Sequence, residues 1–297
     1  MHTPPLPSAL PRPALVSLAA GLALVGWAFW PTFAWLAGKW TEDPQYSHGF
    51  LVPFFSLYLL RSAYRAGTVT FGTPWPAVGL GLLAACAAGR WLAGGLMFHQ
   101  LDCLALLVSL AALVVMAGGR SLLAAAAPAI LFLVFMVPLP YELERNVGGP
   151  LKVVATQAST YLLQTFGLPA VAEGNVILIG EVRLGVVDAC SGLKMLVTFA
   201  AFAAGAILTL DRTRFEKLMI ALGVVPIAVI TNVVRVTATG VAYTLFSDKD
   251  TLHFLHDLHG WLMMPAGLGL LAVQLWALDR LIVRSEPTPR LAGLQFA

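Results

Sequence analysis

A thiol, a guanidinium and several imidazoles stand at the edges of apolar segments in the last third of this chain. Cys190 opens the apolar run in VVDACSGLKML (186–196). Arg235 lies inside another apolar segment, in ITNVVRVTATG (230–240), and HFLHDLHGW (253–261) supplies three histidines. These residue types could provide a nucleophile, an oxyanion stabiliser and a general acid–base.

The chemistry expected of such a set is nucleophilic attack by sulfur on a carbonyl. The thiolate is the attacking species, and a free cysteine titrates near pH 8.5. Positive charge from Lys194 or Arg235 would lower the pKa of Cys190. Arginine keeps its proton, so its expected task is to stabilise the thiolate or an oxyanion, with help from backbone amides near Ser191 and Gly192. A histidine would take the thiol proton and return it to the leaving amine.

A polar stripe on one helix face is expected around the arginine. Asn232, Arg235 and Thr239 are spaced i, i+3, i+7 and therefore share a face. Ionisable groups in membrane spans are costly and mark functional sites. We expect this stripe to face protein or water, near the outer boundary of the membrane and level with Cys190.

The three histidines allow more than one reading. His253, His256 and His259 precede the last apolar segment at spacings of three residues. A metal site is one alternative, but a helix turns about 300° over three residues, so the outer two drift apart. The HExxH pattern is absent. We expect no metal and no cofactor, with one of these histidines as the acid–base.

Composition identifies the class of protein. The chain has 297 residues, 59% of them hydrophobic and 11% charged, with a mean hydropathy of +0.82. Soluble domains carry about 25% charged residues, so this is an integral membrane protein. The net charge of +3 and the lack of a basic, aromatic-rich run argue against a nucleic-acid partner. Cys86 and Cys103 read as core hydrophobes, and no disulfide framework is expected.

The fold expected from these segments is an all-α polytopic membrane bundle with about eight transmembrane helices. A span needs about 20 apolar residues. The candidate spans are 15–37, 49–64, 77–97, 101–118, 121–140, 191–210, 218–246 and 258–283. The short basic loops fall on one side if both termini are cytoplasmic. The site residues then lie on the extracytoplasmic side.

One sizeable segment outside the membrane is expected between the fifth and sixth spans, at 141–189. Residues 148–167 read as an amphipathic interfacial helix. The Val- and Ile-rich stretch after it alternates and reads as two or three short strands. The chain is then a single membrane domain, 1–297, with a flexible cytoplasmic N-terminus (1–14) and a cytoplasmic tail (284–297).

Two further polar residues stand near the expected outer boundary. Arg90, in CAAGRWLAGG, is expected to pair with Asp102, to assist substrate or to snorkel to headgroups. His48, in YSHGFLVP, is expected to have a capping or structural role rather than a catalytic one.

Taken in order, DPQYSHGFLVP, EG, ACSGLK, NVVR and HDLHGW resemble the exosortase/archaeosortase family over roughly residues 20 to 283. The resemblance implies eight spans and a Cys–Arg–His triad. By motif match Cys190 takes the nucleophile position and Arg235 the arginine position. The histidine stands four residues before a glycine, which selects His256 before Gly260 and leaves His259 as the weaker candidate.

The resemblance also implies a function in the bacterial plasma membrane. Family members are thought to cleave membrane-anchored proteins at a C-terminal sorting tail, which has a motif such as Pro-Glu-Pro (PEP-CTERM), one transmembrane helix and a basic cluster. We therefore expect a cysteine protease-transpeptidase that forms a thioester and passes the acyl group to an unidentified acceptor. Some relatives carry a further domain linked to exopolysaccharide production, which is not expected here.

Two other classes of protein remain as alternatives. A transporter could line its pathway with the same polar stripe, although such folds often show internal repeats and broken helices near the midplane. A metal-dependent intramembrane protease could use the histidines. For the thiol site, the expected supporting residues are Lys194, Asn232, His259, Arg90, Ser191 and Gly192.

Overall fold

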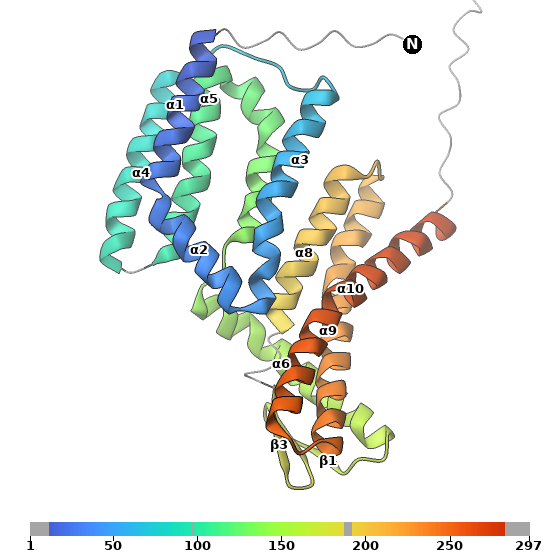
Figure 1. Cartoon of the computed structure of the whole chain (residues 1–297). Coiled ribbons are helices and arrows are strands. Elements are labelled where there is room, and N and C mark those ends of the chain that lie inside the picture. The colour runs from blue at the N-terminus through green and yellow to red at the C-terminus, as the bar shows by residue number, and fades with distance from the viewer. Residues whose placement is uncertain (1–11, 97, 187–191, 283–297) are drawn as a thin grey trace, which may run out of the picture.

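The computed structural model describes residues 12–96, 98–186 and 192–282, a mostly helical chain with one small sheet (Figure 1). Its helices are α1 (Arg12–Ala28), α2 (Trp30–Glu42), η1 (Pro44–Phe50), α3 (Leu51–Arg65), α4 (Pro76–Leu96), α5 (His99–Phe132), η2 (Leu133–Met136), α6 (Tyr141–Thr165), α8 (Gly192–Thr209), α9 (Arg214–Leu245) and α10 (Lys249–Leu281). Its strands are β1 (Ala170–Glu173), β2 (Val176–Ile179) and β3 (Val182–Gly185). The expected tail 284–297 and most of 1–14 lie outside these residues.

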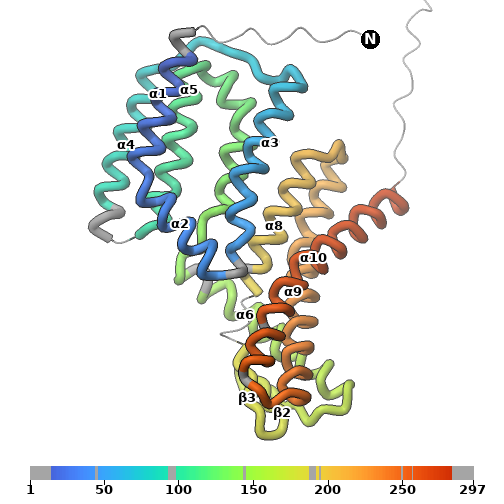
Figure 2. Tube along the Cα trace, viewed as in Figure 1, coloured from blue at the N-terminus to red at the C-terminus, as the bar shows by residue number. Residues whose placement is uncertain are grey.

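The elements form two groups of helices. Figure 1 shows α1, α2, α4 and α5 together on one side, and α8, α9 and α10 on the other. The Cα trace in Figure 2 shows α3 between the two groups, and α6 and the sheet at one end. Contacts join α9 both to α8 and to α10. Helix α9 is therefore the centre of the second group, and its side chains can meet both neighbours.

The first expected span, 15–37, is not one helix. It is divided between α1 and α2, which meet at a bend of 62°. Phe29 at the break has φ −99° and ψ 14°, and a proline stands in the first turn of α2. Proline has no N–H to donate and is favoured in the first turn of a helix. Pro31 therefore favours a new helix at this point rather than the continuation of α1.

Two expected spans, 101–118 and 121–140, fall in α5 and the short η2. Gly118 and Gly119 interrupt α5 with non-helical dihedrals, and Gly119 has φ +62°. Figure 1 shows that the chain turns back there, so α5 forms two legs. The turn is held from outside, because Gly72 N donates to Gly118 O over 3.0 Å. The break expected between the spans 101–118 and 121–140 is therefore present, but it lies at residues 118 and 119, one residue earlier than expected.

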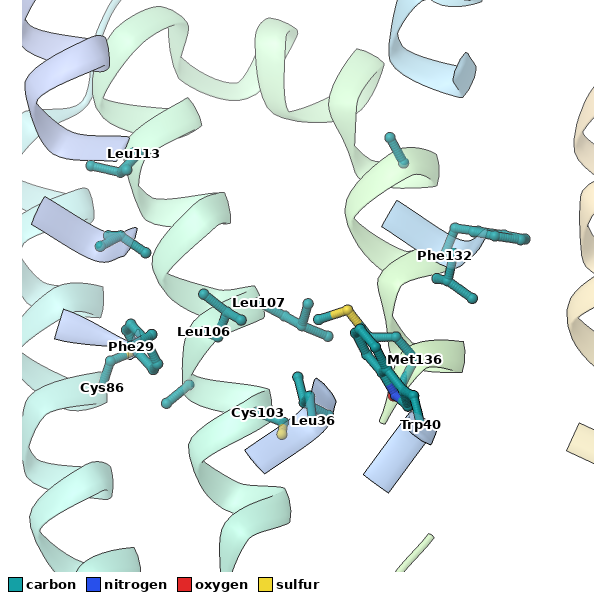
Figure 3. Close-up of a cluster of buried hydrophobic side chains, with 14 of the residues drawn as sticks. Phe29, Leu36, Trp40, Cys86, Cys103, Leu106, Leu107, Leu113, Phe132 and Met136 are labelled. Atoms are coloured by element: carbon teal, nitrogen blue, oxygen red, sulfur yellow. The ribbon is translucent and has the colours of Figure 1, made fainter. Parts of the chain in front are cut away.

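The core of the first group lies between the two legs of α5 and the bent α1–α2 pair (Figure 3). Leu36 and Cys103 are fully buried at its centre, and Leu106 is 1% exposed. Trp40 spans the space to the second leg and donates from Nε1 to Met136 O over 3.0 Å. Cys86 and Cys103 are both buried and free, as expected of core hydrophobes.

The expected insertion is an α/β unit. Helix α6 contains most of the predicted amphipathic helix: it begins seven residues earlier, at Tyr141, and ends two residues earlier, at Thr165. The strands form an antiparallel sheet in the order β1-β2-β3. Alternation along β2 places Ile177 and Ile179 in a core with Leu163 of α6 and Val236 of α9. The sheet is thereby fixed to α9 within one turn of Arg235.

In the described chain, fewer helices than the eight expected are long and apolar enough to cross a membrane. Among the described residues, three helices qualify: His99–Met136, Arg214–Leu245 and Asp250–Leu281. The bent pair α1–α2 would make a fourth, while Pro76–Leu92 and Met195–Thr209 are shorter apolar helices. The difference arises because α5 covers two expected spans, and because α3, with 15 residues, and the two shorter apolar helices are not long enough to qualify. The number eight stays a prediction.

The turn inside α5 gives a test of the fold. A Cβ at Gly119 would lie 2.0 Å from the Thr73 carbonyl oxygen, on a residue with φ +62°. We expect Gly119→Ala to destabilise the protein by about 1–3 kcal/mol or more. The control is Gly81→Ala in α4, where nothing lies within 4 Å and alanine favours the helix by up to about 1 kcal/mol. Denaturant unfolding in detergent measures both, and equal midpoints would contradict the packing described.

Candidate functional site

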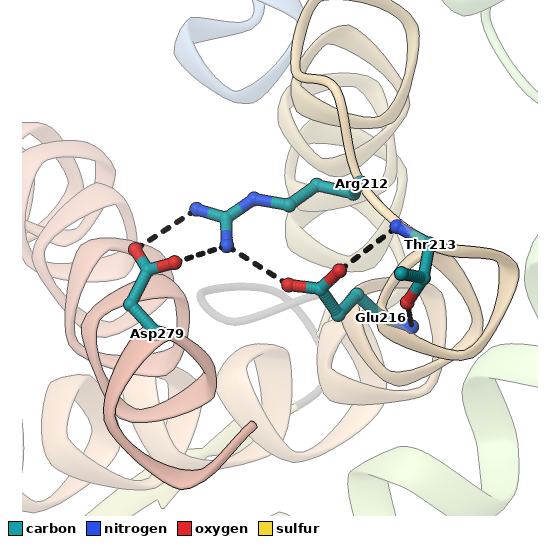
Figure 4. A network of polar contacts seen from close by, with 4 residues as sticks. All are labelled: Arg212, Thr213, Glu216 and Asp279. Atoms are coloured by element: carbon teal, nitrogen blue, oxygen red, sulfur yellow. Dashed lines mark hydrogen bonds and ion pairs between the residues drawn. The ribbon is translucent and has the colours of Figure 1, made fainter. Parts of the chain in front are cut away.

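An ionic network fixes α9 and α10 to each other at one end (Figure 4). Thr213 and Glu216 form a capping box at the start of α9. Arg212 Nη1 donates to Glu216 Oε1 over 3.0 Å, and its two terminal nitrogens bind both oxygens of Asp279 near the end of α10. Glu216 is fully buried, so the arginine is what makes its charge tolerable there.

A hydrogen bond from a side-chain amide also joins α9 and α10, further along the two helices. Gln274 of α10 donates from Nε2 to Met219 O of α9 over 2.7 Å. A Cβ at Gly223 would lie 2.2 Å from that nitrogen, so glycine leaves the space that the amide occupies. Hydrogen bonds between helices and small residues at their contacts are the usual means of association within membranes.

The start of α10 is set by its cap. Asp248 Oδ2 accepts from Thr251 N over 2.9 Å and from Thr251 Oγ1 over 2.7 Å. These bonds to the carboxylate lower the pKa of Asp248 below its ordinary value, so the cap persists into mildly acidic conditions. The cap fixes the first turns of α10, which carry the candidate histidines.

The polar stripe predicted on α9 is buried in protein. Asn232 is 1% exposed, Arg235 3% and Thr239 2%. Their spacing places all three on the side that α8 and α10 cover. The cost of a guanidinium in an apolar environment explains why this face is turned inward.

Arg235 reaches α10 at the turn where the histidines stand. A Cβ at Gly260 would lie 3.3 Å from Arg235 Nη2 and 3.7 Å from Cζ. The guanidinium therefore lies against the backbone of Gly260, which is next to His259 and four residues after His256. A larger residue at position 260 would press on the guanidinium.

The two other members of the stripe also meet neighbouring helices. A Cβ added at Gly192, the first described residue of α8, would lie 3.2 Å from Asn232 Nδ2. Thr239 Oγ1 lies 3.4 Å from His259 Nδ1 on α10. Helices α8, α9 and α10 are thus brought together along one stripe of α9.

Several predicted members of the site lie outside the described residues. These are Cys190 and Ser191, together with the side chains of Lys194 and His256. Gly192 directly follows them and is buried. The nucleophile and the acid–base therefore stay predictions, and the described structure contributes the arginine and the two helices that flank it.

The histidines on α10 differ in their surroundings. His253 is 81% exposed and lies 3.4 Å from Asp257 Oδ2 at the surface. His259 is half-buried and lies near Thr239. No three His, Cys, Asp or Glu side chains converge within the part of the chain that the structure describes, so the metal alternative gains no support from these residues.

Arg90 belongs to a different cluster. Its Nε lies 2.6 Å from Asp102 Oδ1, which confirms the expected pair. Its Nη1 donates to Ala28 O over 2.8 Å, and its guanidinium lies 3.9 Å from the centre of the Phe29 ring. Thr32 also donates to Asp102. Arg90 thus joins α4 to Ala28 at the end of α1 and to Asp102 of α5, and a part in substrate handling stays a prediction.

His48 has contacts that sequence reasoning did not foresee. It is 4% exposed, and its Nε2 donates to Phe135 O over 3.2 Å. Its Nδ1 lies 3.1 Å from the hydroxyl of Thr198, eight residues after Cys190 on α8. His48 therefore joins both groups of helices, in keeping with the structural role expected of it. The sequence signal was a polar residue at the start of an apolar segment, without an indication of its partners.

Comparison with known proteins adds one match. The family model described as Transmembrane exosortase (Exosortase_EpsH) matches residues 40–273, well over half of the chain. No curated protein and no solved structure matched. The match covers α9 and most of α10, with the stripe between them. This chain belongs to the exosortase family of membrane proteins.

Proposed function

We propose that this protein is a membrane-embedded cysteine protease-transpeptidase that removes the C-terminal sorting tail of exported membrane-anchored proteins. The observation that carries the proposal is the burial of Arg235 against Gly260 of α10, beside the candidate histidines. A permanent positive charge held inside a helix bundle needs a purpose that offsets its cost. Stabilising a thiolate and an oxyanion is such a purpose.

The proposed reaction has two steps, and each passes through a tetrahedral intermediate. Cys190 Sγ, as the thiolate, attacks the scissile carbonyl carbon. The C–N bond then breaks, a thioester forms, and His256 gives its proton to the leaving amine. Water or another nucleophile then attacks the thioester and gives its proton to His256, and the thiolate leaves.

Arg235 suits the electrostatic part of this reaction. Its planar guanidinium presents several donors in a fixed geometry and keeps its charge at any pH of interest. It would stabilise the oxyanion in both steps, together with backbone N–H groups near Gly192. Its low exposure strengthens the interaction, because electrostatic effects are larger where water is excluded.

The membrane setting fits a substrate tail that is itself a helix. The proposed site lies at the extracytoplasmic ends of α8, α9 and α10, with both termini of the chain in the cytoplasm of a bacterial plasma membrane. The tail helix would lie in the bilayer beside the bundle and present its scissile bond at that level. The lipid bilayer is thus part of the substrate-binding arrangement.

The nucleophile is tested by Cys190→Ala and Cys190→Ser. We expect both to reduce processing of a tail-bearing substrate by at least about a thousandfold, because the thioester cannot form. Accumulation of full-length substrate in membranes is the measurement. Cys86→Ala, at a buried free cysteine of the first group, is the matched control and should process normally. Normal processing by Cys190→Ala would remove the proposed function.

The arginine is tested by Arg235→Lys, which keeps the charge and loses the planar fork. We expect kcat to fall by about a hundredfold to a thousandfold while the unfolding midpoint stays near that of the wild type. Arg183→Lys on β3, where the arginine is exposed, is the control. An unchanged kcat in Arg235→Lys would contradict the assigned role.

The acid–base assignment is tested by comparing His256→Ala with His259→Ala. We expect His256→Ala to lose about 10²–10⁴-fold in rate, the usual contribution of general acid–base catalysis. His259→Ala removes the contact with Thr239 and should retain most of the activity. If His259→Ala is inactive and His256→Ala is not, the two roles are reversed.

A further inference from the structure

One buried amide beside the proposed site has an oxygen that nothing in the described chain satisfies. Asn232 is 1% exposed, and its Oδ1 has no hydrogen-bond partner. Buried polar atoms in folded proteins are almost always paired, and an unpaired one costs free energy. An asparagine retained under such a cost needs an explanation.

The location of this amide points to the proposed site. Its Nδ2 lies 3.2 Å from the Cβ position at Gly192, two residues after Cys190 in the sequence. Arg235, one turn further along α9, lies against Gly260 of α10. The Asn232 side chain therefore lies against the start of the described part of α8, on the same face of α9 as Arg235.

An unpaired side-chain oxygen is a feature that Asn232 shares with Gln274, whose Nε2 joins α10 to Met219 O of α9 while its Oε1 also lacks a partner. What distinguishes Asn232 is its location, beside Gly192 of α8 and on the face of α9 that carries Arg235. Oδ1 of Asn232 makes no hydrogen bond with the described residues. Leucine has nearly the same shape and would fill the space without the cost of an unpaired oxygen.

We propose that Asn232 binds the substrate, with Oδ1 accepting a hydrogen bond from a backbone N–H of the peptide segment next to the scissile bond. The inference rests on the proposed function, because it takes a peptide as the ligand. An amide oxygen complements any backbone N–H, whatever the side chain. Asn232 would thus hold the peptide in register with Cys190 and Arg235 while leaving recognition of side chains to other residues.

The first experiment measures Asn232→Leu with the tail-bearing substrate that the wild type processes, in proteoliposomes. We expect KM to rise about tenfold, the value of one hydrogen bond to a buried group, with kcat within about twofold. The rate of Cys190 alkylation by iodoacetamide without substrate should not change. Because an unpaired oxygen is removed, the unfolding midpoint should equal or exceed that of the wild type.

A matched control comes from the neighbouring residue. Thr231 is 2% exposed, and its hydroxyl donates to Ile227 O and Ala228 O within α9. Thr231→Val removes a polar atom at the same depth, so its KM should remain at the wild-type value. Asn232→Asp keeps an acceptor oxygen at the position and should recover part of the loss in KM.

The second experiment changes the substrate instead. An ester is placed, one position at a time, in the backbone flanking the scissile bond, which removes a single N–H. One such ester should raise KM for the wild type and leave KM of Asn232→Leu unchanged.

The outcomes separate this inference from the proposed function. If Asn232→Leu shows an unchanged KM, or a lower unfolding midpoint with altered alkylation, the amide is structural and the inference is wrong while the function stands. If Cys190→Ala still processes substrate, or the wild type processes none, the function falls and the inference with it.

Discussion

The burial of one guanidinium constrains this structure more than any other single feature. Arg235 keeps its charge under all ordinary conditions and is 3% exposed in a long apolar helix. Such a group must be enclosed by protein, because a lipid environment would penalise it by several kcal/mol. Helix α10 lies against the guanidinium at Gly260, and α8 packs on the same stripe of α9 at Gly192, beside Asn232.

Close approach of these helices depends on small residues at particular turns. Gly260 leaves room for the guanidinium, and Gly192 leaves room for the Asn232 amide. At Gly240, a Cβ would lie 3.1 Å from Leu163 of α6 and 3.2 Å from Ile179 of β2. Glycines thus lie at three contacts of α9, with α10, with α8 and with α6 and the sheet. Because these glycines have no side chain, the neighbouring groups can lie close to the axis of the helix.

The parts of this arrangement that local pattern determines could be predicted from the sequence. The stripe on α9 followed from spacing and from the cost of polar groups, and the sheet followed from alternation in Val and Ile. Other features depend on residues far apart in the chain. His48 meets partners 87 and 150 residues away, and Arg212 meets Asp279 across 67. No local pattern carries that information, and the bond from Arg90 to Ala28 O beside the bend is likewise a contact between residues far apart, 62 residues in the sequence.

The Arg212 network lies at the end of α9 and α10 remote from Arg235. The distance along α9 from Arg214 to Arg235 is about 31 Å, at 1.5 Å per residue. The Arg212 network and the Gln274 amide join the two helices at and near one end, and the three residues between Leu245 and Lys249 join them at the other. Arg235 and Gly260 therefore lie part-way along a helical hairpin whose two ends are both tied. Neither helix can swing away from the other at that level while both ends hold, so a substrate helix would have to approach the guanidinium from beside the pair rather than by parting it.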